Sequence, residues 1–228
     1  MLFRFFYRCV CEVSWRLLYK AAILWCGKSY FALRAFKQRL KDGIQFPPFL
    51  FFSLTNACNL RCRGCWVGGN DDESVPGDSA LLPQKNYRER KTLSFESIDN
   101  IIRTAQKQSV YFYTLLGGEP FLSPELWKII EAHPEAYFQI ITNGHFLDAE
   151  NVRRLKNAGN VSPLVSLDGF EHQNDARRGE GTFKKAVAGC QELQKQKILY
   201  GIATVVTMRN FESVLSESYV QMAIDQGA

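Results

Sequence analysis

The chain has 228 residues, of which 46% are hydrophobic and 22% are charged. This composition excludes an intrinsically disordered protein and predicts one globular domain with room for an appendage. Seven cysteines are present, an odd number, and three of them lie within eight residues. Such clustering favours metal ligation over a disulfide scaffold, so we expect a reduced compartment and a cytoplasmic protein.

Most of the net charge of +5 lies in an N-terminal arm, residues 1–46, where nine Lys and Arg oppose only Glu12 and Asp42. The first basic side chains recur at four-residue spacing, which in a helix places them on one face and apolar side chains away from it. The longest charge-free stretch around Trp25 is 21–27. It is far shorter than the ~20 apolar residues of a membrane span, and no signal-peptide cleavage pattern follows.

Three roles remain open for this amphipathic helical arm. The favoured role is a helix that packs over the bottom or side of the core domain, with its basic face in solvent. The second is peripheral contact with an anionic membrane, because a face of Arg and Lys opposite Phe, Trp and Leu suits a lipid interface. Nucleic-acid binding is the least favoured role, since no recognised motif accompanies the basic and aromatic residues.

The core domain, residues 47–228, begins at two prolines and alternates strand and helix patterns. The apolar run 50–54 predicts a buried first strand, and a helix capped by Ser94 precedes a second strand at 110–116. Further helix–strand pairs are predicted at 124–132 with 137–142, 148–158 with 162–167 and 182–196 with 199–207, before a last helix at 212–224. Repeated β/α units predict an α/β fold with a parallel sheet, either doubly wound or barrel-like, whose chemistry lies at the carboxyl ends of the strands.

A polar stretch separates the first strand from the first helix of the core domain. Residues 68–91 have no hydrophobic period and are interrupted by Pro76, Gly77 and Pro83. They predict an exposed loop, and loops of this length often serve as lids over active sites.

The three clustered cysteines stand directly after the first predicted strand, in the run Cys58-Asn-Leu-Arg-Cys62-Arg-Gly-Cys65. Soft thiolate ligands select Fe–S clusters, zinc or Cu(I). A four-iron cluster held by three cysteines keeps one iron without a protein ligand, and that iron is a place for a substrate to bind.

A zinc site is the competing interpretation of these cysteines. Structural zinc is tetrahedral, and His133, His145 or His172 could complete a Cys₃His set. The paired spacing of zinc modules is absent, however, and the cysteines fall where an α/β fold places its active site.

The Cys-x₃-Cys-x₂-Cys run after the first strand resembles the hallmark of the radical S-adenosylmethionine (SAM) superfamily, most of all the branch that modifies peptides and matures cofactors. The resemblance covers about residues 48–228. It implies a partial parallel (β/α)6 TIM-like barrel, with five of six strands visible, that follows the helical arm. The run Gly117-Gly118-Glu119-Pro120, at the end of the second strand, is similar to the superfamily motif that contacts the amino group of the SAM methionine.

Physical chemistry agrees with that role for the Gly-Gly-Glu-Pro run, since two glycines allow close backbone approach and a carboxylate accepts from an ammonium group. By the same resemblance, Thr142 and Asn143 would lie near the ribose or the substrate. Ser166 and Arg178 are candidates for contacting the methionine carboxylate, and Asp168 belongs to the same cofactor-binding strand end. The bland alternative is that the Asn-Gly and Asp-Gly pairs are ordinary turns and that Arg178 is solvated.

One position departs from the superfamily pattern. The residue before the third cysteine is usually aromatic, and its ring can stack near the adenine, but here it is Gly64. Trp66, one residue after that cysteine, is a candidate substitute.

The resemblance implies an enzyme with two cofactors, a [4Fe–4S] cluster and SAM. Its reaction is reductive cleavage of SAM to a 5′-deoxyadenosyl radical, which abstracts hydrogen from an unidentified peptide, cofactor precursor or lipid. The partner implied is an external one-electron donor of the flavodoxin or ferredoxin type.

The sequence stops where a sixth strand is expected, so we expect a fragment of a longer protein. Two alternatives to the enzyme remain open. The chain could be a non-catalytic zinc or electron-transfer protein, or a membrane-interface module on a degenerate barrel.

Overall fold

The protein is described by a computed structural model over residues 12–67 and 91–227. The arm forms a continuous helical segment from α2 through a π-helical stretch to α3. The core domain alternates strands and helices after it. The elements in chain order are α2 (Trp15–Lys20), η1 (Ala21–Gly27), α3 (Lys28–Lys41), β1 (Leu50–Ser53), α4 (Phe95–Lys107), β2 (Phe112–Leu116), η3 (Pro120–Leu122), α5 (Leu126–Ala132), β3 (Tyr137–Thr142), α6 (Ala149–Ala158), β4 (Val161–Ser166), α7 (Glu171–Arg178), α8 (Thr182–Lys195), β5 (Gly201–Ala203), α9 (Phe211–Val214) and α10 (Glu217–Asp225).

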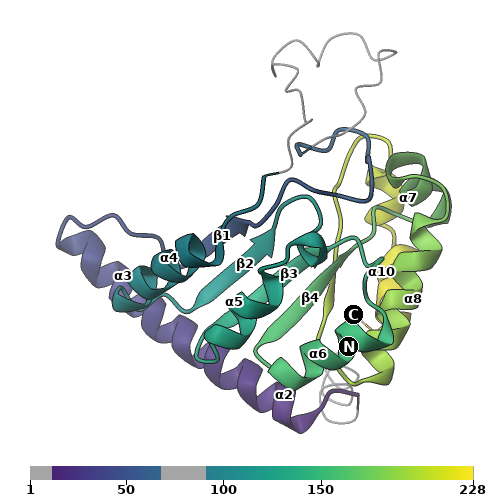
Figure 1. The fold of residues 1–228 in the computed structure, drawn as a ribbon. Helices are drawn as coiled ribbons and strands as arrows, with labels where there is room; N and C mark the ends of the chain where they lie inside the picture. The colour runs from purple at the N-terminus through teal and green to yellow at the C-terminus, as the bar shows by residue number, and fades with distance from the viewer. Residues whose placement is uncertain (1–11, 68–90, 228) are drawn as a thin grey trace, which may run out of the picture.

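The five strands form one parallel sheet in the order β1-β2-β3-β4-β5 (Figure 1). A doubly wound sheet reverses its strand order at a switch point, whereas a barrel wall adds each strand beside the previous one. The observed order is that of a barrel wall, so the α/β prediction is confirmed and the barrel-like form is the one present.

The hydrophobic core lies between the sheet and the helices that follow its strands. Tyr113 and Phe138, on adjacent strands, are completely buried there against Ile98 and Ile102 of α4. Strand side chains alternate between faces, so Phe112 and Tyr137 point to the opposite, inner face of the sheet. One face is thus packed, and the other is available to a site.

The arm crosses the bottom of the sheet, at the amino-terminal ends of the strands (Figure 1). Trp25 stacks on Phe112 and Tyr137, with ring centroids 6.3 and 6.1 Å apart. Because these two partners face the inner side of the sheet, Trp25 covers part of that face at its bottom. The arm therefore packs over the bottom of the core domain.

The expectation that the basic face of the arm is solvated fits only part of the arm, since Arg34, Lys37 and Lys41 are exposed while three other cations reach the core domain. Lys20 Nζ donates to the carbonyl of Ala158 at 2.8 Å, and Lys28 Nζ donates to that of Glu135 at 2.6 Å. Arg39 donates to the carbonyl of Gln108. These carbonyls lie at or just beyond the C-terminal ends of α6, α5 and α4, where unpaired carbonyls and the helix dipole favour a cation.

Three elements differ from their predictions. The strand expected at 199–207 is only Gly201–Ala203, because Val205 N donates to Asp168 Oδ1 instead of a strand partner. No element was predicted between the fourth strand and the helix at 182–196, and the structure has α7 there. The last helix is broken into α9 and α10, because Ser216 caps a new helix by accepting from Tyr219 N at 3.2 Å.

Two further expectations concern membranes and the lid. Over residues 12–67 and 91–227, no helix has the length and apolarity to span a bilayer. The lid predicted at 68–91 lies outside the described residues, apart from Lys91.

Candidate active site

The loop that carries Cys58, Cys62 and Cys65 follows β1 at the carboxyl end of the sheet, and we call it the cysteine loop. All three of its thiols are free; Cys62 is buried, Cys65 is half-buried and Cys58 is exposed. Cys65 N donates to Cys62 O at 3.1 Å, which closes a tight turn between these two cysteines. Gly64 has a φ of +65° in this turn. A residue with a side chain is disfavoured in that conformation, which explains why the usual aromatic residue is missing here.

The surroundings of Cys58 and Cys62 favour the protonated form of these two thiols before any metal arrives. Burial raises the pKa of Cys58 and of Cys62. The nearby charges of Arg178 and Arg177 oppose that rise at Cys62. Uptake of a metal cluster would therefore release protons, because the ligand form is the thiolate.

The donor chemistry fits an iron–sulfur cluster held by three cysteines. In the described ranges, no three His, Cys, Asp or Glu side chains are gathered as around a metal ion, so the competing Cys₃His zinc set is not assembled, and the three cysteines alone are not gathered in that way either. His133 lies at the other end of the sheet, 3.1 Å from Asp99, and His172 is exposed on α7. His145 Nδ1 lies 3.0 Å from the Asn59 side chain, which belongs to the cysteine loop.

Gly117 and Gly118 bring the end of β2 against the start of the cysteine loop. Gly118 N donates to Thr55 O at 2.6 Å, and Glu119 N donates to Ala57 O at 2.8 Å. A Cβ on Gly117 would lie 2.4 Å from Thr55 O, and one on Gly118 would lie 2.1 Å from Ala57 O. The close approach predicted for these glycines is thus made to the backbone of the chain itself.

Glu119 joins the ends of β2 and β3. Its Oε1 accepts from Thr142 Oγ1 at 2.8 Å and from Phe121 N at 3.3 Å, while Oε2 accepts from Asn143 N at 2.8 Å. The side chain is only 1% exposed. Burial raises the pKa of Glu119 to about 7, and the three donors limit that rise because they favour the carboxylate.

The pKa of Glu119 predicts a pH-dependent contribution to stability. Between pH 4.5 and 7 the unfolded chain loses this proton while the native state keeps it, so the contribution falls as the pH rises. Between pH 4 and pH 8, the free energy of unfolding of the wild-type apoprotein should fall by roughly 3 kcal/mol relative to that of the Glu119→Gln variant. Urea unfolding of both proteins at several pH values measures this difference. Parallel pH profiles would contradict the assignment.

Thr142 and Asn143 both form side-chain hydrogen bonds to residues that follow neighbouring strands. Thr142 is 1% exposed, and its hydroxyl is used by Glu119. Asn143 Nδ2 donates to Asn59 Oδ1 at 2.8 Å, which ties β3 to the cysteine loop. In the described structure, Thr142 is a buried support and Asn143 is a bridge to the loop.

Asp168 is the centre of a buried ion-pair network beyond β4. Its Oδ2 lies 2.6 Å from both Arg177 Nη1 and Arg178 Nε, and its own side chain is fully buried. Burial alone would raise the pKa of Asp168, but the hydrogen bonds and charges of the two arginines hold it below its usual value. The carbonyl of Arg177 accepts from Arg63 N at 2.8 Å. The network therefore anchors the cysteine loop to the end of α7.

The bland alternative of a solvated Arg178 is wrong, since its side chain is 10% exposed and paired. Arg177 and Arg63 were not predicted as site residues. The adjacent Arg177-Arg178 pair close after Asp168 was the available signal. Ser166, at the end of β4, is 7% exposed beside this network.

Substitution Asp168→Asn should destabilise the apoprotein by about 3–5 kcal/mol, because a neutral amide leaves two largely buried guanidinium groups without a counter-charge. The matched control is Glu171→Gln, which breaks an exposed pair with Lys184 and should leave the free energy of unfolding almost unchanged. Urea unfolding measures both. Equal decreases in the free energy of unfolding of the two variants would contradict a stabilising role for the buried network.

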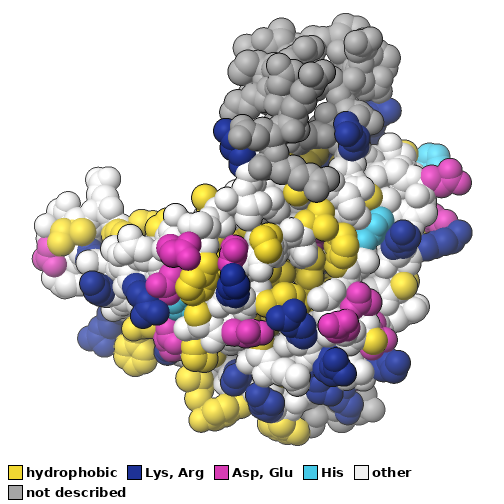
Figure 2. Space-filling view, in the orientation of Figure 1, with side chains coloured by type: hydrophobic (Ala, Val, Ile, Leu, Met, Phe, Trp, Pro, Cys, Tyr) yellow, Lys and Arg dark blue, Asp and Glu magenta, His cyan; other side chains and the backbone are white. Residues whose placement is uncertain are grey.

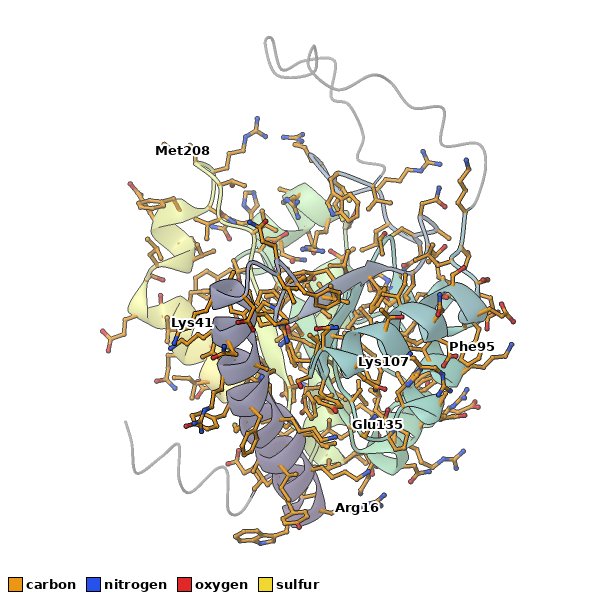
Figure 3. All side chains as sticks on the ribbon, turned by 90° about the vertical axis from the view of Figure 1, so that its left-hand side faces the viewer. Arg16, Lys41, Phe95, Lys107, Glu135 and Met208 are labelled. Atoms are coloured by element: carbon orange, nitrogen blue, oxygen red, sulfur yellow. The ribbon has the colours of Figure 1, made fainter. Side chains whose placement is uncertain are left out.

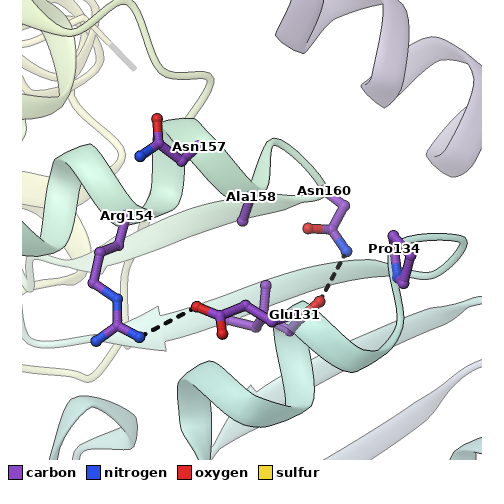
Figure 4. A pocket seen from close by; sticks show the side chains of 7 residues that line it. Glu131, Pro134, Arg154, Asn157, Ala158 and Asn160 are labelled. Carbon is purple, nitrogen blue, oxygen red and sulfur yellow. Dashed lines mark hydrogen bonds and ion pairs between the residues drawn. The ribbon is translucent and has the colours of Figure 1, made fainter.

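A cavity of about 330 Å³ lies at the opposite end of the sheet and is separate from this site (Figure 4). Glu131 and Arg154 form an ion pair of 3.2 Å beside it, and Arg154 also lies 4.2 Å from the centre of the Trp127 ring. The lining residues are Ile130, Glu131, Pro134, Arg154, Asn157, Ala158 and Asn160.

The fold and site together define an α/β-barrel protein whose active edge is built around a cysteine loop. A family model described as the Radical SAM superfamily matches residues 52–215, so the chain belongs to the radical SAM superfamily. Membership in this superfamily implies a [4Fe–4S] cluster and SAM as cofactors.

Curated relatives come from peptide and cofactor maturation. Mycofactocin maturase MftC of Mycobacterium tuberculosis is 29% identical over 196 residues, which cover 84% of this chain and 45% of that protein. AdoMet-dependent heme synthase of Methanosarcina barkeri is 28% identical over 172 residues, with 74% and 45% covered. The chain thus spans less than half the length of these relatives.

Solved structures share the fold. Streptococcus suis SuiB bound to S-adenosylmethionine matches with a TM-score of 0.65 and 19% identity, covering 86% of this chain and 43% of that one. The anSMEcpe structure with bound AdoMet matches with a TM-score of 0.58 and 21% identity, covering 78% and 48%. At these identities the likeness establishes the fold alone.

Proposed function

We propose that this enzyme cleaves SAM reductively and uses the product radical on a peptide or cofactor precursor. When bound and reduced by an external flavodoxin- or ferredoxin-type donor, the cluster supplies one electron that breaks the bond between the SAM sulfur and its 5′ carbon, giving methionine and a 5′-deoxyadenosyl radical, which takes a hydrogen atom from the substrate. Cys58, Cys62 and Cys65 would hold the cluster.

The observation that carries the proposal is the hydrogen-bonded convergence of three strand ends, those of β2, β3 and β4, on the cysteine loop that follows β1. Backbone hydrogen bonds of Gly118 and Glu119 join the end of β2 to the loop, and the Asn143 side chain joins the end of β3 to it. The Asp168 network joins the loop to the end of β4 and to α7. Parallel β/α folds place their chemistry at this edge. Thiols, a carboxylate and a guanidinium group are therefore held together where SAM would bind.

Each side chain has a distinct task in this proposal. Glu119 would accept from the methionine amino group, and Ser166 with Arg178 would donate to the methionine carboxylate. Asp168 Oδ2 accepts a hydrogen bond from Arg178 Nε, and this bond orients the plane of the guanidinium group. Asp168 is thus a positioning residue for Arg178. Asn143 would hold the cysteine loop near the ribose, supported by the buried Thr142.

The substrate would bind against the inner face of the sheet, which Trp25 partly covers at the bottom. Such cover limits the entry of water, which a reactive radical requires. Peptide and cofactor-precursor substrates are favoured because the relatives' names describe maturases and tetrapyrrole synthases.

The test is anaerobic reconstitution of the full chain with iron and sulfide, followed by reduction with dithionite in the presence of SAM. A [4Fe–4S] chromophore and formation of 5′-deoxyadenosine are expected, measured by absorbance and mass spectrometry. Stoichiometric zinc with no iron chromophore and no nucleoside product would instead establish the non-catalytic zinc protein.

A further inference from the structure

The arm presents its large apolar side chains outward. Trp15, Tyr19, Tyr30 and Phe31 are each more than 60% exposed, and Ile23 is 43% exposed. Figure 3 shows the arm from its outer side, with Arg16 and Lys41 near its two ends, and Figure 2 shows hydrophobic side chains along the lower edge of the molecule. These five side chains define the outward face of the arm.

This orientation follows from what the arm buries. Its inward contacts use Leu17 and the small residues Ala21 and Ala32, together with the cations that reach helix C-terminal carbonyls. Trp25 also points inward, where it stacks on Phe112 and Tyr137. An ordinary surface helix buries its apolar stripe. This arm instead exposes several of its largest apolar side chains and directs three of its cations toward the core domain.

The charge of the arm complements an anionic surface. From Trp15 to Lys41 the sequence contains no Asp or Glu. Arg34, Lys37 and Lys41 are exposed at the C-terminal part of the same helix. Trp and Tyr prefer the boundary between acyl chains and headgroups, and nearby basic residues attract anionic lipids.

We propose that the outward face of the arm binds the surface of an anionic lipid bilayer. A helix lying in the plane of the interface would insert Trp15, Tyr19 and Ile23 between headgroups, while Arg34, Lys37 and Lys41 pair with lipid phosphates. The arm lies at the amino-terminal ends of the strands, and the cysteine loop lies at their carboxyl ends. The membrane-bound enzyme would therefore keep its active edge open to the aqueous side.

The test is flotation of the full chain with vesicles of phosphatidylcholine alone or mixed with phosphatidylglycerol. The wild type should float with the mixed vesicles, and added salt should weaken that binding. The triple variant Trp15→Ser, Tyr19→Ser, Ile23→Ser should lose flotation. The triple variant Arg34→Gln, Lys37→Gln, Lys41→Gln should bind the mixed vesicles roughly a hundredfold more weakly.

A matched control removes exposed apolar side chains far from the arm. Met208, Leu215 and Val206 are 94%, 62% and 52% exposed, and their joint replacement by Ser should leave flotation unchanged. Circular dichroism of every variant checks that it is folded.

Three outcomes would overturn the proposal: wild type that stays with the unbound fraction, flotation of the folded apolar variant equal to wild type, or loss of flotation in the control. Concentration-dependent dimers in sedimentation, abolished by the apolar variant while wild type fails to float, would assign the face to a second copy of the chain. None of these results depends on SAM cleavage, so failure here and failure of the proposed function are distinguishable.

Discussion

The Cys62→Ala protein is expected to bind no [4Fe–4S] cluster after reconstitution, and Cys58→Ala and Cys65→Ala should behave alike. Three thiols are the smallest protein ligand set for a cluster with one open iron, and the described structure has no further cysteine at the loop to replace a lost one. The measurements are iron content and visible absorbance. The expected change is complete loss of the chromophore and of 5′-deoxyadenosine.

Cys190→Ala is the matched control for these three variants. Cys190 is fully buried on α8, and burial raises the pKa of its thiol to about 12, so it is a core residue and not a ligand. This variant should take up as much iron as the wild type, with only a small loss of stability. Loss of the cluster in it would overturn the ligand assignment.

Gly118→Ala should destabilise the protein by at least about 3 kcal/mol and should sharply lower cluster uptake. The new Cβ would lie 2.1 Å from Ala57 O and 2.5 Å from Ala57 C. Both atoms are backbone and cannot rotate away, so the cysteine loop or the end of β2 must shift. Such a shift breaks the 2.6 Å hydrogen bond from Gly118 N to Thr55 O.

The control for Gly118→Ala is Gly27→Ala in the arm. The nearest contact there is 3.6 Å, so the methyl group fits without strain. Because Ala has a higher helix propensity than Gly, this variant should be as stable as the wild type or up to about 1 kcal/mol more stable. Urea unfolding and iron content measure both variants, and unchanged values for Gly118→Ala would contradict the close approach.

Local patterns were sufficient to predict the sheet and the place of its cysteines. Apolar runs located the first four strands within about two residues, because buried parallel strands are continuous and hydrophobic. The predicted Ser94 cap marked a helix start in the same way. Helix α7 was missed because its single buried residue is Asn174, a polar side chain that no hydrophobic period reveals.

Contacts between distant segments could not be predicted from one sequence. The carbonyl of Arg177 holds Arg63 N, and a backbone acceptor has no residue-type signal. The arm illustrates the same limit, since a helical pattern separates two faces without telling which one is buried. Basic side chains are ordinarily solvated, but Lys20, Lys28 and Arg39 donate to carbonyls near the C-terminal ends of α6, α5 and α4.

The long reach of these arm contacts has a consequence for the order of folding. Arg16 and Asn157 are 141 positions apart, and Lys20 and Ala158 are 138 apart. During synthesis the arm leaves the ribosome well before the carbonyls that it will bind exist. Contacts of such high sequence separation form slowly, since chain entropy must be lost before they stabilise anything. The arm is made before the core domain but docks on it late, and until it docks its aromatic side chains can contact other surfaces or chaperones.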